Sequence, residues 1–256
     1  MINIVKENAF IVEVAGKDSI AAVLKALKQF KFKNLLSVSL WHRAIYGNIY
    51  EPLHYFKYLI ENFPFEGIIH GDLIYLDAAN LFEQTIVKTL TIIQKYFKYY
   101  HPCPACHLFF HMIRIPIAKH YNINQFITGE REYHGTIQKL NQLSEILSTF
   151  KNLLHKYQIE LIQPLKKIQD DKKIYELLEN LNTIRITPSK CIFSKSYYDE
   201  MKGIPLNLKL IISSLKEFYY PLLSKIVDFI IDENREPDEI WINEQINAVV
   251  TNLKLT

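Results

Sequence analysis

The sequence predicts an α/β fold with a mostly parallel five-stranded sheet, flanking helices and an all-helical C-terminal extension. Short runs rich in β-branched and aromatic residues alternate with longer segments of helical periodicity up to residue 165. Strands that alternate with helices favour parallel pairing, because each helix carries the chain back across the sheet. Beyond residue 200 only helical periodicity remains. We therefore expect an α/β domain over residues 1–200 and a helical extension over residues 201–256.

Five runs are short and apolar, which is typical of buried parallel strands. They are residues 10–14, 34–40, 67–74, 125–128 and 160–165, the third being interrupted by Gly71-Asp72. Helical spacing is found in residues 19–30, 51–63, 78–100, 109–121, 135–157 and 171–181, and Pro116 should interrupt the fourth of these helices. In the C-terminal part, residues 182–202 are irregular, and residues 206–231 and 237–250 have helical spacing.

The composition indicates a globular protein with a sizeable core. The chain has 256 residues, of which 49% are hydrophobic and 22% charged. The net charge of +3 permits a nucleic-acid partner without indicating one. Residues 1–8 lack the apolar run of a signal peptide, and no uncharged stretch is long enough to span a bilayer, so we expect a cytoplasmic protein without membrane contact. A homodimer is compatible with the sequence, which does not name the oligomeric state.

Residues 14–19 read Val-Ala-Gly-Lys-Asp-Ser and lie between the first predicted strand and the first predicted helix. The backbone N–H groups at the start of a helix lack partners within the helix, and the helix dipole favours negative charge there. Gly16 would allow close approach of a ligand, Lys17 supplies a positive charge and Ser19 a hydroxyl group. The segment therefore predicts a phosphate site. The alternative is an Asp or Ser cap of an ordinary helix.

The same residues resemble the SGGKDS loop of the PP-loop ATP pyrophosphatases. That family includes tRNA thiolases, tRNA lysidine synthetase, the nitrile-forming deazaguanine synthase and GMP synthetase. Gly16, Lys17, Asp18 and Ser19 match the loop, whereas Val14 and Ala15 replace its first Ser and first Gly. The resemblance implies a HUP-type parallel sheet that binds ATP with Mg²⁺. It also implies a nucleotide site that includes Ala15, Gly16, Lys17, Asp18 and Ser19, of which Asp18 is catalytic as well.

The resemblance extends over residues 1–196. Ile127-Thr128-Gly129 resembles the strand end that lies beside the adenine in that family. Gln163-Pro164-Leu165, followed by Cys191, resembles the "RPL … C" segment of cluster-dependent tRNA thiolases. In those enzymes a C-x-x-C pair and one distant cysteine hold a [4Fe-4S] cluster. The resemblance therefore implies a tRNA substrate and a nucleotide site that also includes Ser39 and Gly129.

The chain contains three cysteines, Cys103, Cys106 and Cys191. Thiolates in C-x-x-C spacing can bind one metal ion or one cluster, and the fold could place Cys191 at the same edge of the sheet. We expect all three to hold a [4Fe-4S] cluster, with Cys103 and Cys191 as catalytic residues of sulfur transfer. The alternatives are a persulfide relay between two thiols, a zinc ion completed by His101 or His107, and buried thiols without a chemical role.

Other polar residues follow predicted strand ends, where ligands bind in open α/β sheets. Glu130, Arg131 and His134 cluster after the fourth strand. We expect Arg131 to contact phosphate or substrate, the alternative being a surface ion pair with Glu130 or Glu132. Asp72, near the end of the third strand, is a candidate Mg²⁺ ligand.

Two further groups are ambiguous from the sequence. His107 and His111 lie four residues apart and could share a metal ion, but a helical surface pair is the favoured interpretation. Arg114, one turn further on, could contact phosphate. Trp41, His42 and Arg43 follow the second strand, where the enzymes that the chain resembles hold the adenine and the substrate, and a packed Trp41 is the favoured interpretation. The basic run Lys25, Lys28, Lys31 and Lys33 could contact RNA phosphates, and a solvated helix face is the favoured interpretation.

Together these features predict an ATP-dependent sulfurtransferase. ATP would activate a nucleobase carbonyl oxygen as an adenylate, the loop and Mg²⁺ would stabilise the departing pyrophosphate, and sulfur would then displace AMP. The sulfur donor would be hydrosulfide or a persulfide carrier. One alternative is an amide- or nitrile-forming ligase whose cysteines hold zinc. Another is a nucleotide- or metal-binding module without enzymatic activity.

Overall fold

The computed structural model describes residues 9–30, 33–48, 50–62, 69–70, 73–99, 101–133, 139–178, 190–193 and 207–254. Within these residues one sheet has the order β4-β2-β1-β6-β7, with β5 also beside β2, and every pair is parallel. Its strands are β1 (Ala9–Glu13), β2 (Asn34–Trp41), β4 (Ile69–His70), β5 (Ile74–Asp77), β6 (Gln125–Ile127) and β7 (Glu160–Ile162). β4 pairs with the start of β2 and β5 with its end, so together they fill the position of the third predicted strand. The predicted parallel α/β sheet is confirmed.

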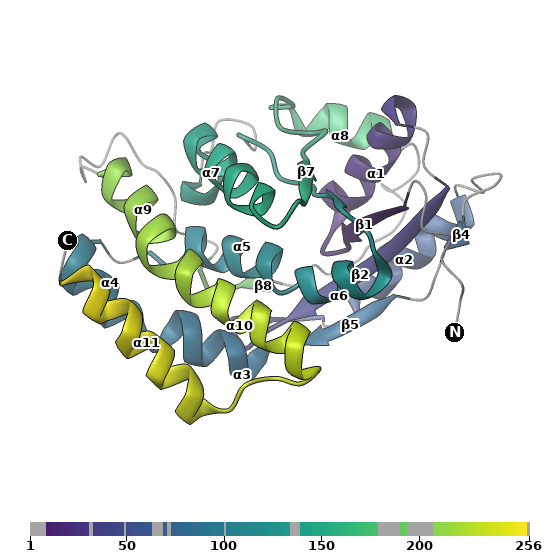
Figure 1. Cartoon of the computed structure of the whole chain (residues 1–256). Coiled ribbons are helices and arrows are strands. Elements are labelled where there is room, and N and C mark those ends of the chain that lie inside the picture. The colour runs from purple at the N-terminus through teal and green to yellow at the C-terminus, as the bar shows by residue number, and fades with distance from the viewer. Residues whose placement is uncertain are drawn as a thin grey trace.

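Helices cover both faces of this sheet (Figure 1). On one face lie α1 (Lys17–Gln29), α2 (Glu51–Asn62) and α8 (Asp171–Leu177), packed on Phe10 and Val12 of β1. On the other face lie α5 (Cys103–Met112), α6 (Ile115–Tyr121) and α7 (Ser144–His155), together with the turn η2 (Leu140–Gln142), packed on Ile11. Successive residues of a strand point to opposite faces, so the continuous apolar run of β1 supplies both cores.

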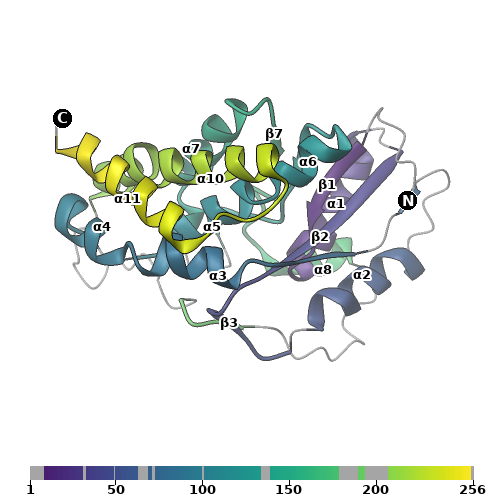
Figure 2. The same ribbon diagram turned by 60° about the horizontal axis from the view of Figure 1, so that its bottom comes forward.

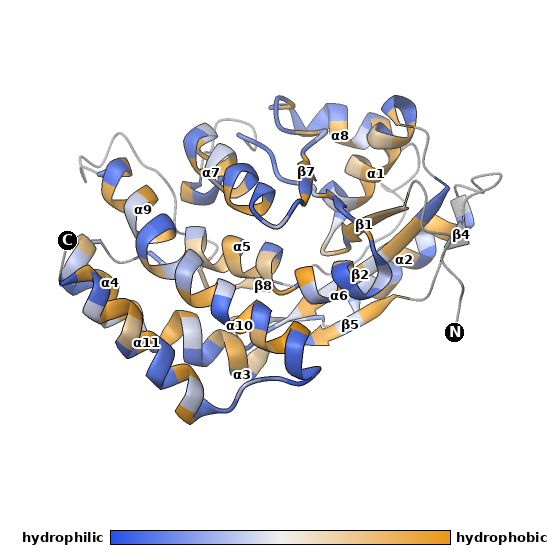
Figure 3. Ribbon diagram, in the orientation of Figure 1, coloured by the Kyte–Doolittle hydropathy of each residue, from blue (hydrophilic) through white to orange (hydrophobic). Residues whose placement is uncertain are grey.

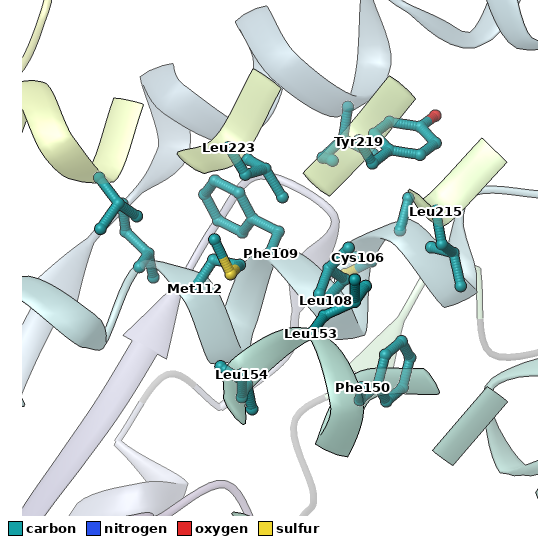
Figure 4. Packing of buried hydrophobic residues seen from close by; sticks show 14 of the residues in the cluster. Cys106, Leu108, Phe109, Met112, Phe150, Leu153, Leu154, Leu215, Tyr219 and Leu223 are labelled. Carbon is teal, nitrogen blue, oxygen red and sulfur yellow. The ribbon is translucent and has the colours of Figure 1, made fainter. Parts of the chain in front are cut away.

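The C-terminal helices belong to the second of these cores. α9 (Leu208–Ser214) continues through the π-helical turn η5 (Leu215–Tyr219) into α10 (Tyr220–Glu233), and α11 (Glu239–Leu253) follows after a hydrophilic link (Figure 3). Figure 4 shows Leu215, Tyr219 and Leu223 of this segment packed over the apolar side chains of α5 and α7. The helical extension is therefore packed directly on the helices that cover the sheet.

A long helical segment connects β5 to α5. It consists of α3 (Ala79–Phe82), the π-helical turn η1 (Glu83–Val87) and α4 (Leu90–Phe97), and it lies against the C-terminal helices (Figure 2). The buried hydroxyls of Tyr99 and Ser214 lie 2.5 Å apart and join the end of this segment to α9. None of the described helices is both long and apolar enough to cross a bilayer.

A second, two-stranded sheet pairs β3 (Ile45–Tyr46) with β8 (Lys190–Cys191) in antiparallel orientation. Ile45 is the partner of Cys191, and the Ile192 N–H donates to the Ala44 carbonyl at 2.9 Å. The sequence predicted an irregular segment around Cys191, so this pairing is a correction. The pairing places β8 near the carboxyl end of β2, because β3 follows that end closely. The third cysteine is thereby tied to the carboxyl-end edge of the main sheet.

Candidate functional site

The centre of the sheet provides the place where a ligand is expected. β1 is flanked by β2 on one side and β6 on the other, so the connections leave β1 and β6 toward opposite faces. In open parallel sheets, ligands bind at this switch point, outside the carboxyl ends of the strands. The predicted loop, residues 14–19, follows β1, and residues 128–131 follow β6. The two segments that the sequence singled out therefore meet at the switch point.

The contact between these segments depends on Gly129. A Cβ atom at this position would lie 2.5 Å from the Asp18 carbonyl carbon and 2.6 Å from the Ser19 nitrogen. Only glycine therefore allows the strand end after β6 to pass so close to the start of α1. Gly16 differs, since its backbone is extended and an added Cβ would have no atom within 4 Å. Gly16 therefore faces open space at the start of α1.

The start of α1 has its own ordering contacts. The helix begins at Lys17, two residues before the predicted start at residue 19, and the Ala15 N–H donates to the Ser19 hydroxyl at 3.2 Å. Asp18 does not act as the helix cap. Its carboxylate accepts from the Lys17 ammonium at 2.8 Å and from Nε of Arg131 at 3.3 Å. The predicted loop residues are therefore held in a defined conformation by polar contacts.

Arg131 is buried beneath this loop. Besides Asp18, it donates to Asp171 of α8 at 2.5 Å, and Lys17 lies 3.8 Å from the same carboxylate. The alternative of a surface ion pair with Glu130 or Glu132 is therefore wrong, because Arg131 has no exposed side-chain surface and pairs with Asp18 and Asp171. We call Lys17, Asp18, Arg131 and Asp171 the loop side of the site. It carries two positive and two negative side chains beside the positive end of the α1 dipole.

Glu130 lies between Gly129 and Arg131 in the chain, and its side chain contacts α5. Its carboxylate accepts from His107 Nδ1 at 3.0 Å, His111 Nε2 at 3.2 Å and the Gln163 amide at 3.0 Å. Burial alone would raise the pKa of Glu130, but the interactions with His111 and His107 outweigh it and hold the pKa below its usual range. Gln163 is the first residue after β7. Glu130 therefore joins three segments at the edge of the sheet.

The interpretation of His107 and His111 as a surface pair is wrong, because His111 is only 1% exposed. Its Nδ1 accepts from Arg114 at 2.7 Å, and Arg114, fully buried, lies 3.5 Å from Glu13 at the end of β1. Arg114 is therefore buried against His111 and Glu13. His107, one third exposed, has the Asn141 amide at 3.0 Å from its Nε2.

The cysteines lie on the same side of the edge. Cys103 and Cys106 occupy the first turn of α5, which begins six residues before the helix predicted over residues 109–121. Pro104 is tolerated because the first helical N–H groups need no intrahelical acceptor. The Cys103 thiol donates to the Phe193 carbonyl at 3.2 Å, and the Phe193 N–H donates to the Cys191 sulfur at 3.4 Å. Burial, with the charges of Cys191 and Cys103, raises the pKa of Cys106 well above its usual value.

His42 is the residue that sequence reasoning missed as part of this group. It follows β2, is fully buried, and its Nε2 lies 3.5 Å from the Cys106 sulfur. Burial, followed by the charge of His107, lowers the pKa of His42 to about 4. Its position directly after a predicted strand was the signal that could have identified it. We call His42, the three cysteines, His107, His111, Arg114 and Glu130 the α5 side of the site.

The arrangement of the cysteines and histidines bears on whether they suit a single metal ion or an iron–sulfur cluster. Within the described residues, no three His, Cys, Asp or Glu side chains are placed to hold a single metal ion. His101 and His107 therefore do not form a ready-made zinc site with the cysteines in this arrangement, because zinc draws all four ligands to within about 2.3 Å of one atom. A [4Fe-4S] cluster takes its thiolates on separate irons and tolerates wider spacing. Three neighbouring thiols, two of which have N–H groups directed at their sulfurs, are a suitable donor set for it.

Four residues singled out from the sequence lie elsewhere or cannot be placed. Ser39 is buried in β2, opposite Tyr75 of β5, on the strand that ends beside the loop. Trp41, at the end of β2, is partly buried, as expected of a packing residue. Asp72 and His134 lie outside the described residues. The structure thus brings the loop, Gly129, Arg131 and the cysteines to one edge of the sheet.

No family model matches the chain. The uncharacterized protein MJ0009 of Methanocaldococcus jannaschii is 31% identical over 220 residues, which cover 84% of this chain and 78% of that protein.

Two solved structures are similar over much of the chain. One is the U34-tRNA thiolase NcsA from Methanococcus maripaludis with its [4Fe-4S] cluster, at 15% identity and a TM-score of 0.39, over 97% of this chain and 72% of that one. The other is the predicted subunit of tRNA methyltransferase from Methanocaldococcus jannaschii, at 21% identity and a TM-score of 0.33, over 68% and 73%. The parallel sheet and the loop after β1 are features that the resemblance to PP-loop ATP pyrophosphatases predicted. The identity to MJ0009 and the share of both chains that it covers show that this chain belongs to the family of MJ0009.

Proposed function

We propose that this chain is an ATP-dependent sulfurtransferase that activates a nucleobase carbonyl, in tRNA, and replaces its oxygen by sulfur. The observation that carries the proposal is the placement of a phosphate-type loop and three thiols at one edge of a parallel sheet. Gly129, Glu130 and Arg131 join them, since Gly129 and Arg131 contact the loop and Glu130 contacts α5. The tRNA substrate follows from the resemblance of the loop and cysteine pattern to the tRNA thiolases.

In this proposal the start of α1 binds the phosphates of ATP. The N–H groups of its first turn, the Lys17 ammonium and Mg²⁺ would stabilise the charge on the departing pyrophosphate while the carbonyl oxygen bonds to the α-phosphorus. Arg131 holds Asp18 and so keeps the loop in place. Cys103, Cys106 and Cys191 would hold a [4Fe-4S] cluster, which supplies the site where the sulfur donor binds. Sulfur then adds to the activated carbon, and AMP leaves with the original oxygen.

Calorimetric titration with a non-hydrolysable ATP analogue tests the loop. Gly16→Ala is the sharpest variant, because its Cβ meets no protein atom within 4 Å but would stand where the phosphates approach. We expect its affinity for the analogue to fall at least tenfold while the thermal unfolding temperature stays unchanged. Equal binding by the wild-type protein and this variant would contradict a nucleotide site at α1.

A second assay separates sulfur transfer from the alternatives. The protein is purified anaerobically, and iron, zinc and acid-labile sulfide are measured together with pyrophosphate release in the presence of tRNA and sulfide. The proposal expects iron and sulfide in the protein and pyrophosphate release that depends on tRNA. Zinc with ammonia-dependent pyrophosphate release would instead indicate an amide- or nitrile-forming ligase, and ATP binding without turnover a nucleotide-binding module.

A further inference from the structure

His42 is held in one orientation by its surroundings. Its ring stacks on Phe82 with centroids 3.8 Å apart and an angle of 10° between the ring planes. The ring is fully buried, and Phe110 lies against it at a centroid distance of 5.1 Å. Close packing of this kind favours one orientation of the ring, in which Nδ1 and Nε2 face different groups.

The backbone determines which nitrogen of His42 carries the proton. The Ala44 N–H donates to Nδ1 at 3.1 Å, so Nδ1 must offer its lone pair and cannot bear a hydrogen. In a neutral imidazole the hydrogen then lies on Nε2. The turn that holds Ala44 is itself fixed, because the Ile45 N–H donates to the His42 carbonyl and the Ile192 N–H to the Ala44 carbonyl, both at 2.9 Å. The protonated nitrogen is therefore Nε2, which lies 3.5 Å from the Cys106 sulfur.

The three cysteines consequently differ in what faces their sulfurs. Cys106 has the imidazole N–H of His42, and Cys191 has the backbone N–H of Phe193. Cys103 has the carbonyl oxygen of Phe193 at 3.2 Å, to which only a protonated thiol can donate. N–H groups directed at a sulfur favour its negatively charged form and are a principal influence on the reduction potential of a bound iron–sulfur cluster.

We propose that His42 is a positioning residue of the cysteine site, which holds its Nε2–H against the Cys106 sulfur and does not itself bind a metal. A metal ion on Nε2 would move the proton to Nδ1, where it would face the Ala44 N–H donor. The inference rests on the proposed function only in assuming that Cys106 is used as a thiolate. It adds to that function a residue outside the C-x-x-C pattern and assigns its tautomer.

The first test needs no cofactor. Nitrogen-15 NMR of the histidine-labelled protein without metal distinguishes a protonated from an unprotonated ring nitrogen. We expect His42 to carry its hydrogen on Nε2 only, with a correlation that disappears in His42→Phe. A hydrogen on Nδ1, or on both nitrogens, would overturn the proposal.

The second test compares His42→Phe with His42→Gln after anaerobic reconstitution with iron and sulfide. Phe retains the stack on Phe82 but removes the donor, whereas the Gln amide nitrogen can replace Nε2–H. We expect His42→Phe to bind iron 10- to 100-fold more weakly, as is typical for loss of a group that orients a metal ligand. The midpoint potential of the cluster that forms should also be more negative, and His42→Gln should restore both quantities in large part.

The outcomes separate this inference from the proposed function. If the wild-type protein takes up no iron, the cysteine site fails and the role of His42 fails with it. If the wild-type protein takes up iron but His42→Phe has an unchanged affinity and potential, only the role of His42 is overturned. Failure of His42→Gln to restore either quantity, with a changed absorption spectrum, would mean that His42 is itself a ligand. Should His42→Phe not fold, the NMR measurement on the wild-type protein decides the question.

Discussion

The loop side and the α5 side of the site are built from the same short segment but in opposite ways. Gly129 and the fully buried Arg131 contact the loop, and the other charged groups of the loop side, Lys17, Asp18 and Asp171, are 26%, 20% and 47% exposed. Glu130 contacts α5, where it is 7% exposed and its partner His111 1%. Charges near water are screened and exchange partners at little cost, whereas buried ones must be fully paired. The loop side therefore suits a changing ligand, and the α5 side a fixed arrangement.

The largest expected effect of a single substitution is on the α5 side. Glu130→Ala removes the charged acceptor for His107, His111 and Gln163, and the buried His111 is left without it. A hydrogen bond to a charged group contributes about 1.5–3 kcal/mol, so the loss of three of them should exceed the effect of any other single substitution considered. Urea unfolding at neutral pH measures the decrease in the free energy of unfolding. Glu160→Ala is the matched control, because the Glu160 contact with Gln125 is exposed and its removal should change stability by less than about 0.5 kcal/mol.

The same carboxylate predicts a dependence on pH. The pKa of Glu130 in the folded protein lies below its ordinary value of 4.5, so its ionised form is bound more favourably in the folded state. Its contribution to stability is therefore complete above pH 4.5 and is lost as the pH falls toward the folded-state pKa. Glu130→Gln should be less stable than the wild-type protein at neutral pH, and the difference should shrink on acidification. A constant difference would contradict an ionised Glu130.

An intermediate effect is expected where the two sides meet. Gly129→Ala places a Cβ 2.5 Å from the Asp18 backbone, and backbone atoms cannot move aside as a flexible side chain could. Overpacking of this kind typically costs about 1–3 kcal/mol. Gly16→Ala is the control from the same site, with unchanged stability because its Cβ contacts nothing. Equal stability of the two alanine variants would show that the strand end does not press on α1.

The smallest effect is expected within the loop. Ser19→Ala removes the acceptor of the Ala15 N–H. The loss of one side-chain bond at a helix start costs about 1 kcal/mol, and less if water can replace it. Thermal unfolding measures this loss of stability. Calorimetry should show that the affinity of Ser19→Ala for the ATP analogue falls by more than the small loss of stability would suggest. A stability loss as large as that of Glu130→Ala would erase the distinction between the two sides.

The sequence alone determined the local features. Continuous apolar runs predicted parallel strands buried on both faces, and Gly16, Lys17 and Ser19 after such a run predicted a helix start at a ligand edge. These predictions depend on neighbouring residues, whose spacing in the chain fixes their spacing in space. For the same reason the C-x-x-C pair was visible, because two cysteines three positions apart are close in any local structure.

Only the tertiary structure decided which distant residues meet. The pairing of β3 with β8 brings Cys191 opposite Ile45, and the turn after β2 directs His42 at Cys106. Nothing in the spacing of residues 42, 106 and 191 encodes these contacts, because they depend on how the sheet and α5 pack. The burial of His111 and Arg131 could not be predicted from the sequence either, because a polar residue is expected at the surface unless its partner is known. Those partners, Glu130 and Asp18, lie 19 and 113 positions away. The chemistry of the site thus follows from packing that brings such distant partners together, and local pattern alone does not specify it.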